Sequence, residues 1–341
     1  MAIDISKFKT RRVLVVGDLV IDEFIQGTVE TLTREAPVPV VTVDREYFEL
    51  GGAGNVARNL AALGARTSMV GVSGSGSGAK ILMDAFARHK IDSTGVFQEK
   101  SRKTLRKTRI ISSCQQMLQL ERETKVPVSV PAESAMILAI RDRMPDVDLV
   151  IVSDHGKGTL TRPLLTELLA LARKSNIMVV VDPWGTGYEK YSGATILVPD
   201  VRELALETGI PTRERSGLFK AGTELLKTAR VEGLAVTCGR DGIVMFEKAV
   251  QPVFIESEPR QVFDQTGVHD TMVAVLGLSL TTGGSFKDAA TVANVAAGIA
   301  MDKLGTARVT EKEMILELMA YSGQTSPEAS PEMFARKQIF Y

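Results

Sequence analysis

A glycine, a histidine and an aspartate lie where an apolar helical pattern begins, in the segment VFDQTGVHDTMVAVLGLSL at residues 262–280. The start of a helix presents about four N–H groups without intrahelical partners and the positive end of the helix dipole, so it attracts anions. Asp270 can therefore be a plain first-turn or capping residue. Alternatively, the amides of Gly267, Val268 and His269 form an anion hole for a transferring phosphoryl group, and Asp270 accepts the proton of the attacking hydroxyl. The segment alone leaves both interpretations open.

Polar side chains also follow four segments that are predicted to be buried strands. They are Asp18 after RRVLVVG, Asp154 and Lys157 after DLVIVS, Asp182 after IMVVV, and Asp200 and Glu203 after ATILVP. In an open parallel sheet the carboxyl ends of the strands form the ligand crevice. Each residue alone is more typical of a loop or a cap, but as a set they indicate one site.

A glycine-rich turn, GGAGNVARN at residues 51–59, precedes a helical pattern. Gly51 and Gly52 let the backbone approach a ligand closely, and the amide of Asn55 can bond sugar hydroxyls. A turn that simply opens a helix is the alternative. The segment is no Walker loop, because no GK[ST] follows, and it lacks the GxGxxG dinucleotide pattern.

These residues require a scaffold of alternating strands and helices, and the chain supplies it over most of its length. Extended segments at about 24–48 and 103–122 interrupt the alternation, and they predict a small separate sheet. We therefore predict an α/β fold: one doubly wound, mostly parallel sheet with an inserted β lid, over residues 1–321. Residues 322–341 are predicted to form a polar C-terminal tail.

The composition narrows the possible partners. Lys plus Arg and Asp plus Glu both number 41, so the formal net charge is +0, and nothing suggests a nucleic-acid or anionic membrane partner. Cys114 and Cys238 lack CxxC spacing, and His89 and His155 lack the spacing of metal ligands. With no apolar signal core and no long apolar run, the sequence predicts a cytoplasmic protein.

Several stretches together resemble the PfkB family of ribokinase-like sugar kinases, over essentially the whole chain. They are VLVVGDLVIDEF, REAPVPVVTV, GGAGNVARNLAALGA, SDHGKG, VDPWGT, VPDVRE, DQTGVHDT and AAGIAMDKLGTARVT. Within the family the chain is most similar to kinases of heptose 7-phosphate, which act in lipopolysaccharide precursor synthesis. The resemblance implies a ribokinase-like fold, ATP and Mg²⁺ as cofactors, a sugar phosphate as acceptor, and a homodimer formed through the β lid. No HxGH nucleotidyltransferase motif follows, so only kinase activity is implied.

The resemblance also implies roles for individual residues. Asp270 would be the catalytic base, and Asp264, Thr266 and Gly267 would shape the anion hole. Asp18, Gly51, Gly52, Asn55 and Lys157 would bind the sugar substrate. Asp200 and Glu203 would position Mg²⁺ through water, with Thr237 and Gly239 beside the nucleotide. Arg34, Arg102, Lys103 and Arg106 on the lid are candidates for the distal phosphate, because guanidinium groups match phosphate geometry.

The chain departs from the family pattern at the site itself. The family signature GAGD is GVHD here, Trp184 stands in place of lysine, His155 in place of tyrosine and Asp200 in place of asparagine. His269 can point away, donate to a phosphate, or block it. The alternatives to a heptose 7-phosphate kinase are therefore a kinase of another sugar or phosphosugar, and a pseudokinase that binds ligands without turnover.

Overall fold

The structure is a computed structural model, and it describes residues 3–113, 115–258, 265–303, 305–306 and 308–324. Its body is a nine-stranded sheet in the order β13-β12-β11-β10-β9-β8-β1-β4-β5. The strands are β1 (Arg12–Gly17), β4 (Arg66–Ser73), β5 (Asp92–Gln98), β8 (Leu149–Ser153), β9 (Met178–Asp182), β10 (Ile196–Leu197), β11 (Gly233–Thr237), β12 (Gly242–Glu247) and β13 (Val253–Glu256). All neighbours pair in parallel except β11 with β12 and β12 with β13. The predicted doubly wound, mostly parallel sheet is thus confirmed.

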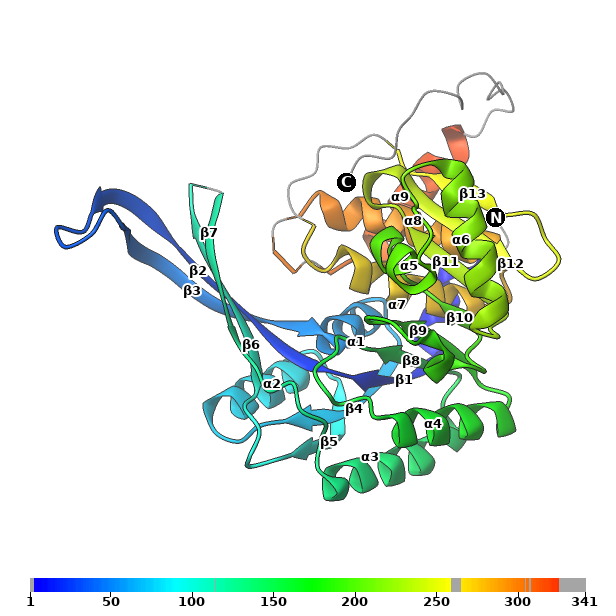
Figure 1. The fold of residues 1–341 in the computed structure, drawn as a ribbon, viewed down its shortest axis with the longest axis horizontal. Helices are drawn as coiled ribbons and strands as arrows, with labels where there is room; N and C mark the ends of the chain where they lie inside the picture. The colour runs from blue at the N-terminus through cyan, green and yellow to red at the C-terminus, as the bar shows by residue number, and fades with distance from the viewer. Residues whose placement is uncertain (1–2, 114, 259–264, 304, 307, 325–341) are drawn as a thin grey trace.

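Helices cover both faces of this sheet. They are α1 (Ala53–Ala62), α2 (Ser77–Arg88), α3 (Val130–Arg143), α4 (Arg162–Lys174), α5 (Val201–Thr208), α6 (Arg215–Thr228), α7 (Val268–Thr281), α8 (Phe286–Met301) and α9 (Glu311–Gln324). The short 3₁₀ helices are η1 (Ile5–Thr10), η2 (Met144–Asp146), η3 (Tyr188–Tyr191) and η4 (Gly239–Asp241). Figure 1 shows these helices packed around the central strands.

The apolar run of β1 explains the two layers, because successive side chains of a strand point to opposite faces. Val13 and Val15 pack into a core shared with α1, α7 and α8, whereas Leu14 and Val16 pack into a core shared with α3, α4 and α6. Helix α7 is apolar on almost every side and is buried along its length, as expected for a helix inside a large core. The first turn of α7 is thereby held firmly over the sheet.

The order in which strands are added to the sheet switches sides at β1, which lies between β4 and β8. Strands β4 and β5 extend the sheet on one side, and β8 to β11 extend it on the other. Such a switch point opens a crevice at the carboxyl ends of the strands. Gly17 and Ser153, which end β1 and β8, are register partners, so Asp18 and Asp154 emerge side by side.

A second sheet forms the predicted lid. Its four strands have the order β3-β2-β6-β7, with bounds β2 (Leu19–Leu32), β3 (Pro39–Gly52), β6 (Leu105–Ser112) and β7 (Gln115–Arg122). Strand β2 continues directly from the switch point, and Figure 1 shows the β2–β3 ribbon reaching far out from the body. The lid is therefore tied to the crevice at its base and is free of the body at its tip.

Some details differ from the sequence patterns. Strand β5 and helix α3 are additional elements that the patterns do not predict. Residues 322–324, expected to begin a polar tail, belong to α9, and residues 325–341 lie outside the described part of the chain. In that described part, no helix is both long and apolar enough to cross a bilayer.

Candidate active site

The larger of two adjoining cavities lies over the carboxyl ends of β8 to β11 and has a volume of about 630 Å³. Its lining includes Asp154, His155, Asp182, Trp184, Asp200, Arg202, Glu203, Thr237, Gly239, Arg240, Gln265, Val268, His269 and Asp270. These side chains come from successive strand ends, as the sequence predicts for the crevice of an open sheet. Predicted nucleotide-side residues Thr237, Gly239, Asp200 and Glu203 all lie here.

The second cavity, of about 380 Å³, lies between the lid and the first turn of α7. Its lining residues are Val20, Asp22, Gly52, Lys107, Arg109, Gln116, Gln119, His155, Gln265, Thr266, Gly267 and Asp270. Polar and charged side chains dominate this list. A polyhydroxy or phosphorylated ligand suits such a lining better than an apolar one.

Asp270 lies at the junction, since it lines both cavities together with His155 and Gln265. Its side chain is buried, and Oδ2 accepts a hydrogen bond of 2.7 Å from Asn55 Nδ2. Burial raises the pKa of the Asp270 carboxyl above its usual value, while His155 and the Asn55 hydrogen bond act in the opposite direction. A buried carboxylate with a raised pKa is what general-base catalysis requires.

Asn55 is held in place by Arg58, one turn further along α1. Arg58 Nη2 donates to Asn55 Oδ1 at 2.8 Å, and the same guanidinium donates to Glu49 and to the backbone oxygen of Thr306. The arginine is buried, and burial lowers its pKa. Because Asn55 has its oxygen occupied by Arg58, its amide nitrogen must face Asp270. The amide is thus directed at the carboxylate in this structure, whereas the sequence suggested sugar hydroxyls.

Helix α7 begins with a glycine for steric reasons. Gly267 is the N-cap with φ +78°, a conformation that other residues rarely adopt, and it provides no capping side chain. A Cβ atom on Gly267 would lie 2.6 Å from Asn55 Nδ2. The bare start of α7 therefore faces the second cavity beside Asp270, as an anion-binding helix terminus would.

The structure shows where the unusual His269 side chain points. Its Nε2 lies 2.8 Å from Asp182 Oδ1 at the end of β9. Burial by itself lowers the pKa of the imidazole, but Asp182, Glu203 and Asp270 outweigh this effect and raise it to about 9. The ring is therefore an imidazolium at neutral pH, turned sideways toward β9.

Asp200 and Glu203 form a reciprocal cap at the start of α5. Asp200 Oδ1 accepts from the amides of Arg202 and Glu203, both at 2.7 Å, and Glu203 Oε2 accepts from the Asp200 amide at 2.9 Å. Burial raises the pKa of Glu203 to about 7, with Asp182 and Asp200 adding to the effect and the amide bond opposing it. Within the described chain, the second oxygen of each carboxylate makes no hydrogen bond. This pair of hard oxygen donors facing the larger cavity fits Mg²⁺.

A second group of side chains could in principle bind a metal, but its carboxylates already have partners within the protein. His155, Asp182 and Asp270 place nitrogen and oxygen atoms within 4.8 Å of one another. However, Asp182 is paired with His269 and Asp270 with Asn55. We assign no metal to this cluster.

Asp18 and Lys157, which the resemblance implies as sugar ligands, make contacts within the protein in this structure. The Asp18 carboxylate is fully buried and accepts from the amides of His155, Lys157 and Thr159 at 2.9, 3.1 and 3.3 Å. The Lys157 ammonium pairs with Glu123 beyond the end of β7. Neither lines the second cavity in this structure, and both residues fix the loop after β8; their contact with substrate stays a prediction.

The lid candidates for the distal phosphate also lie elsewhere. Arg34 is exposed in the turn between β2 and β3, and Lys103 is exposed just before β6. Arg102 is buried and donates to the backbone oxygens of Thr124, Val126 and Lys157. Arg106 pairs with Glu23 at 3.2 Å. The structure therefore does not bring these four residues to the second cavity.

Lys107 and Arg109 are the basic residues that do line the second cavity, and the sequence reasoning missed them. They lie two positions apart on β6 and so share a face, opposite to Arg106. Arg109 Nη1 donates to Asp22 Oδ1 at 2.6 Å, whereas Lys107 makes no ion pair within the described residues. The sequence signal for them is the alternation in KTR, residues 107–109, where two basic residues two positions apart on a strand share one face.

Of the remaining predicted site residues, Gly52 lines the second cavity, whereas Gly51 lines neither cavity. Gly51 and Gly52 end β3, and a Cβ atom on Gly51 would lie 2.5 Å from Asp22 Oδ2. Thr266 lines the second cavity, and Asp264 lies outside the described residues. Trp184 is half exposed on the wall of the larger cavity and packs against Gly156.

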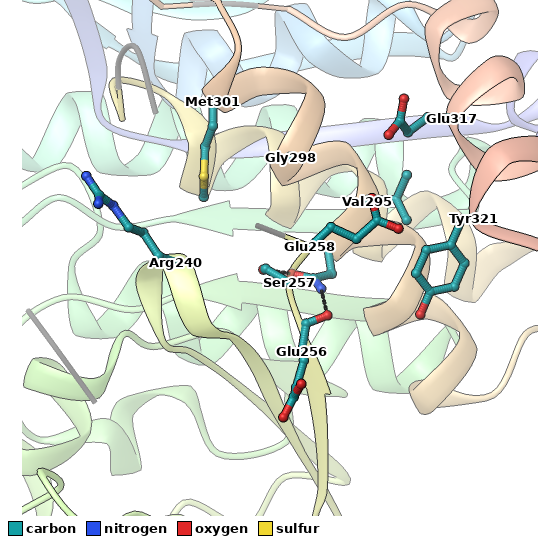
Figure 2. Close-up of a pocket in the computed structure, with 10 residues that line it drawn as sticks. Arg240, Glu256, Ser257, Glu258, Val295, Gly298, Met301, Glu317 and Tyr321 are labelled. Atoms are coloured by element: carbon teal, nitrogen blue, oxygen red, sulfur yellow. Dashed lines mark hydrogen bonds between the residues drawn. The ribbon is translucent and has the colours of Figure 1, made fainter. Parts of the chain in front are cut away.

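A smaller recess of about 140 Å³ adjoins the larger cavity between β13, α8 and α9 (Figure 2). Arg240, Asn294 and Met301 line both spaces. Asn294 accepts from Ser257 Oγ at 2.8 Å and donates to the Glu256 backbone oxygen at 3.0 Å. The crevice is therefore long, running from the lid past Asp270 to the C-terminal helices.

Two cavities that meet at a buried carboxylate, over the carboxyl ends of a doubly wound sheet with a separate β lid, are arranged as in the ribokinase-like fold class. The ribokinase of Arabidopsis thaliana complexed with ribose and ATP superimposes with a TM-score of 0.72 at 19% identity, covering 90% of this chain and 98% of that one. Phosphofructokinase-2 from Escherichia coli in complex with potassium gives 0.76 at 17% identity, covering 92% and 99%. These likenesses establish the fold.

The sequence comparisons establish the family. Residues 10–313 match the model of the pfkB family of carbohydrate kinases, and the chain belongs to that family. It is 41% identical over 328 residues to the bifunctional protein HldE of Desulfatibacillum aliphaticivorans, covering 95% of this chain and 67% of that protein. It is 43% identical over 302 residues to the HldE protein of Geobacter metallireducens, covering 89% and 62%. The chain thus spans about two thirds of the length of these relatives, and the predicted resemblance is confirmed.

Proposed function

We propose that this protein transfers the γ-phosphoryl group of ATP to a sugar phosphate, with heptose 7-phosphate as the acceptor and heptose 1,7-bisphosphate as the product. The observation that carries the proposal is the position of Asp270, whose buried carboxylate lines both cavities. A residue there can reach an acceptor hydroxyl on one side and a phosphoryl group on the other. Family membership and the likeness to HldE proteins support the choice of reaction and acceptor.

In the proposed reaction ATP lies in the larger cavity and the sugar phosphate in the second. The acceptor oxygen forms a bond to the γ-phosphorus, the bond from that phosphorus to the β–γ bridging oxygen breaks, and ADP leaves. Asp270 takes the hydroxyl proton, and the amides at the start of α7 stabilise the negative charge on the transferring group. Asn55 and Arg58 keep the Asp270 carboxylate oriented.

Asp200 and Glu203 would hold Mg²⁺ through their free oxygens, which supplies positive charge beside the phosphates of ATP. Because both carboxylates also cap α5, their position is fixed before ligands arrive. Use of ATP is consistent with the cytoplasmic location that the sequence predicts.

For the acceptor, we propose that the distal phosphate lies against Lys107 and Arg109 on β6. Gln116 and Gln119 on β7 line the same wall and can donate further hydrogen bonds. Basic lid side chains that line the same cavity as Asp270 suit a substrate with an anionic far end. These residues replace Arg34, Arg102, Lys103 and Arg106 as the phosphate-binding candidates.

The test is ADP release with Mg-ATP and a panel of acceptors: heptose 7-phosphate, fructose phosphates and the free sugars. We expect turnover that depends on heptose 7-phosphate and much weaker turnover with the unphosphorylated sugars. If only another phosphosugar gave turnover, that phosphosugar would be the acceptor, and the proposed phosphoryl-transfer reaction would stand. No turnover with any acceptor, although calorimetry shows ATP binding, would favour a pseudokinase.

We further propose that the lid mediates a homodimer. Its two edge strands carry large exposed apolar side chains: Val43 on β3 is 54% exposed, and Met117 and Leu118 on β7 are 42% and 52% exposed. Apolar residues gathered on one small sheet are typical of an interaction surface. Such a contact would also cover the strand edges that an isolated four-stranded sheet leaves open.

Multi-angle light scattering is expected to give twice the chain mass of 36.9 kDa. The double substitution of Val43 and Leu118 by aspartate should yield monomers, because a charge buried in an apolar interface is strongly unfavourable. Leu206→Asp is the matched control, since Leu206 is 64% exposed on α5, away from the lid. A wild-type protein that stays monomeric at high concentration would contradict the lid dimer.

A further inference from the structure

The His269–Asp182 pair stands out because it places a cation in a cavity where most of the ionisable lining residues are acidic. Five carboxylates line the larger cavity: Asp154, Asp182, Asp200, Glu203 and Asp270. Such a wall repels a polyphosphate unless positive charge compensates it. Arg202 and Arg240 also line it, but they come from α5 and η4, and His269 alone extends from the first turn of α7 beside Asp270.

The ring of His269 is held at one nitrogen and open at the other. Nε2 is 2.8 Å from Asp182 Oδ1, and the Asp182 side chain is only 7% exposed, so it forms a fixed anchor. No hydrogen bond within the described residues uses Nδ1, and the histidine side chain is 32% exposed on the cavity wall. An imidazolium so placed has one N–H left to donate to a ligand.

The charge of this ring is set by the groups that face it. Asp182 faces it from the end of β9, Glu203 from the first turn of α5, and Asp270 from its own helix, and together they raise the pKa to about 9 against the effect of burial. Since the pKa is above the ordinary value of 6.5, the cation persists through neutral pH and is lost as the pH rises through about 9.

We propose that His269 is a phosphate ligand of bound ATP, oriented by Asp182, so that its imidazolium contacts the polyphosphate from the start of α7. This inference rests on the proposed use of ATP. The side chain thereby adds a fixed positive charge to a site where the backbone amides already attract phosphate. Asp182 acts through His269 and is a positioning residue.

Nucleotide binding, measured by calorimetry with ATP, ADP and adenosine, tests the contact without an acceptor. In EDTA at pH 7.5 we expect His269→Gln to weaken ATP and ADP by about 10- to 100-fold and to leave adenosine unchanged, because a charge-assisted hydrogen bond to phosphate is lost. His89→Gln is the matched control, since His89 ends α2 outside both cavities. The difference between wild type and His269→Gln should shrink above pH 9.

A second readout is the titration of the histidine rings by NMR. The chain has three histidines, so single substitutions of His89 and His155 assign the resonances. We expect one ring to titrate near pH 9, to shift when ADP is added, and to return toward 6.5 in Asp182→Asn. The His89 ring should titrate near 4, because burial lowers its pKa and Arg58 and Arg308 lower it further.

Three results would overturn the inference. Equal ATP affinity in wild type and His269→Gln would show that the ring does not contact phosphate. Tighter ATP binding by His269→Gly would show that the ring obstructs the site. If the His269 ring titrated near 6.5, its pair with Asp182 would not form in solution. If wild-type protein bound ATP through His269 but turned over none of the acceptors, the proposed kinase reaction would be refuted and the His269 contact would stand.

Discussion

Replacement of Asp270 by asparagine is expected to lower kcat by about 10²- to 10⁴-fold, the range that general-base catalysis contributes. Asparagine has nearly the same size, and its amide oxygen can accept the hydrogen bond that Asn55 Nδ2 now gives to Asp270 Oδ2. It cannot take a proton from the acceptor hydroxyl. Because a base acts in the transition state, the affinity for ATP should change little. Steady-state ADP release and calorimetry with ATP measure the two quantities separately.

Asp288→Asn is the matched control for this substitution. Asp288 occupies the first turn of α8, three residues after its N-cap Ser285, as Asp270 does three residues after Gly267. It lines neither cavity, so its replacement should leave turnover unchanged. Wild-type kcat in Asp270→Asn would remove Asp270 from the role of base. A thermal unfolding midpoint far below that of wild type would assign the loss to folding instead.

The pH profile provides an independent check on the same residue. Burial raises the pKa of Asp270, and the base works only when ionised. Activity should therefore fall as the pH decreases through a pKa above the ordinary aspartate value of 3.8. This acidic limb should be absent from the residual activity of Asp270→Asn, because asparagine does not titrate.

Much of the site could be predicted from sequence because strand ends converge in a doubly wound sheet. Asp154, Asp182 and Asp200 follow three buried apolar strands, and the structure brings all three to the larger cavity. The start of α7 was recognisable from Gly267 and the apolar run behind it. The lid was recognisable because extended segments broke the alternation of strands and helices. These features depend on local pattern and topology alone.

Side-chain direction was not predictable in the same way. On β6, Arg106 and Lys107 differ by one residue, and that single step moves a side chain from one face of a strand to the other. Asp18 looked like a ligand residue at a strand end, yet three loop amides occupy its carboxylate. The polar loop after β8 folds back over Asp18, and no local pattern reveals that contact.

The partner of His269 was beyond sequence reasoning for a related reason. His269 and Asp182 are 87 positions apart, and they meet only because the first turn of α7 lies at the carboxyl end of β9. From sequence, the histidine could equally point away, contact phosphate or block it. Once the fold is known, the carboxylate of Asp182 explains how a bulky ring is accommodated where the family pattern has a small residue. Departures from a motif thus need the three-dimensional neighbours before they can be interpreted.

Lys107→Met is expected to lower kcat/KM for a phosphorylated acceptor by about 10- to 100-fold and to leave kcat/KM for the free sugar unchanged. Lys107 lines the lid-side cavity and makes no ion pair in the described part of the chain, so its ammonium is available to a phosphate. The loss corresponds to about 1.5–3 kcal/mol, the value of a hydrogen bond to a charged group. Methionine keeps the length of the side chain and removes only the charge. Initial rates with matched phosphorylated and free sugars give the measurement.

Lys103→Met separates this prediction from a general effect of lid charge. Lys103 is exposed just before β6 and lines neither cavity, so its loss should leave both acceptors unaffected. Arg109 is a poorer probe, because its removal would also leave the Asp22 carboxylate without its 2.6 Å partner. If Lys107→Met slowed both acceptors equally, the lysine would serve the lid rather than the phosphate. If Lys103→Met gave the larger loss, the lid would have to close differently, with the start of β6 over the acceptor.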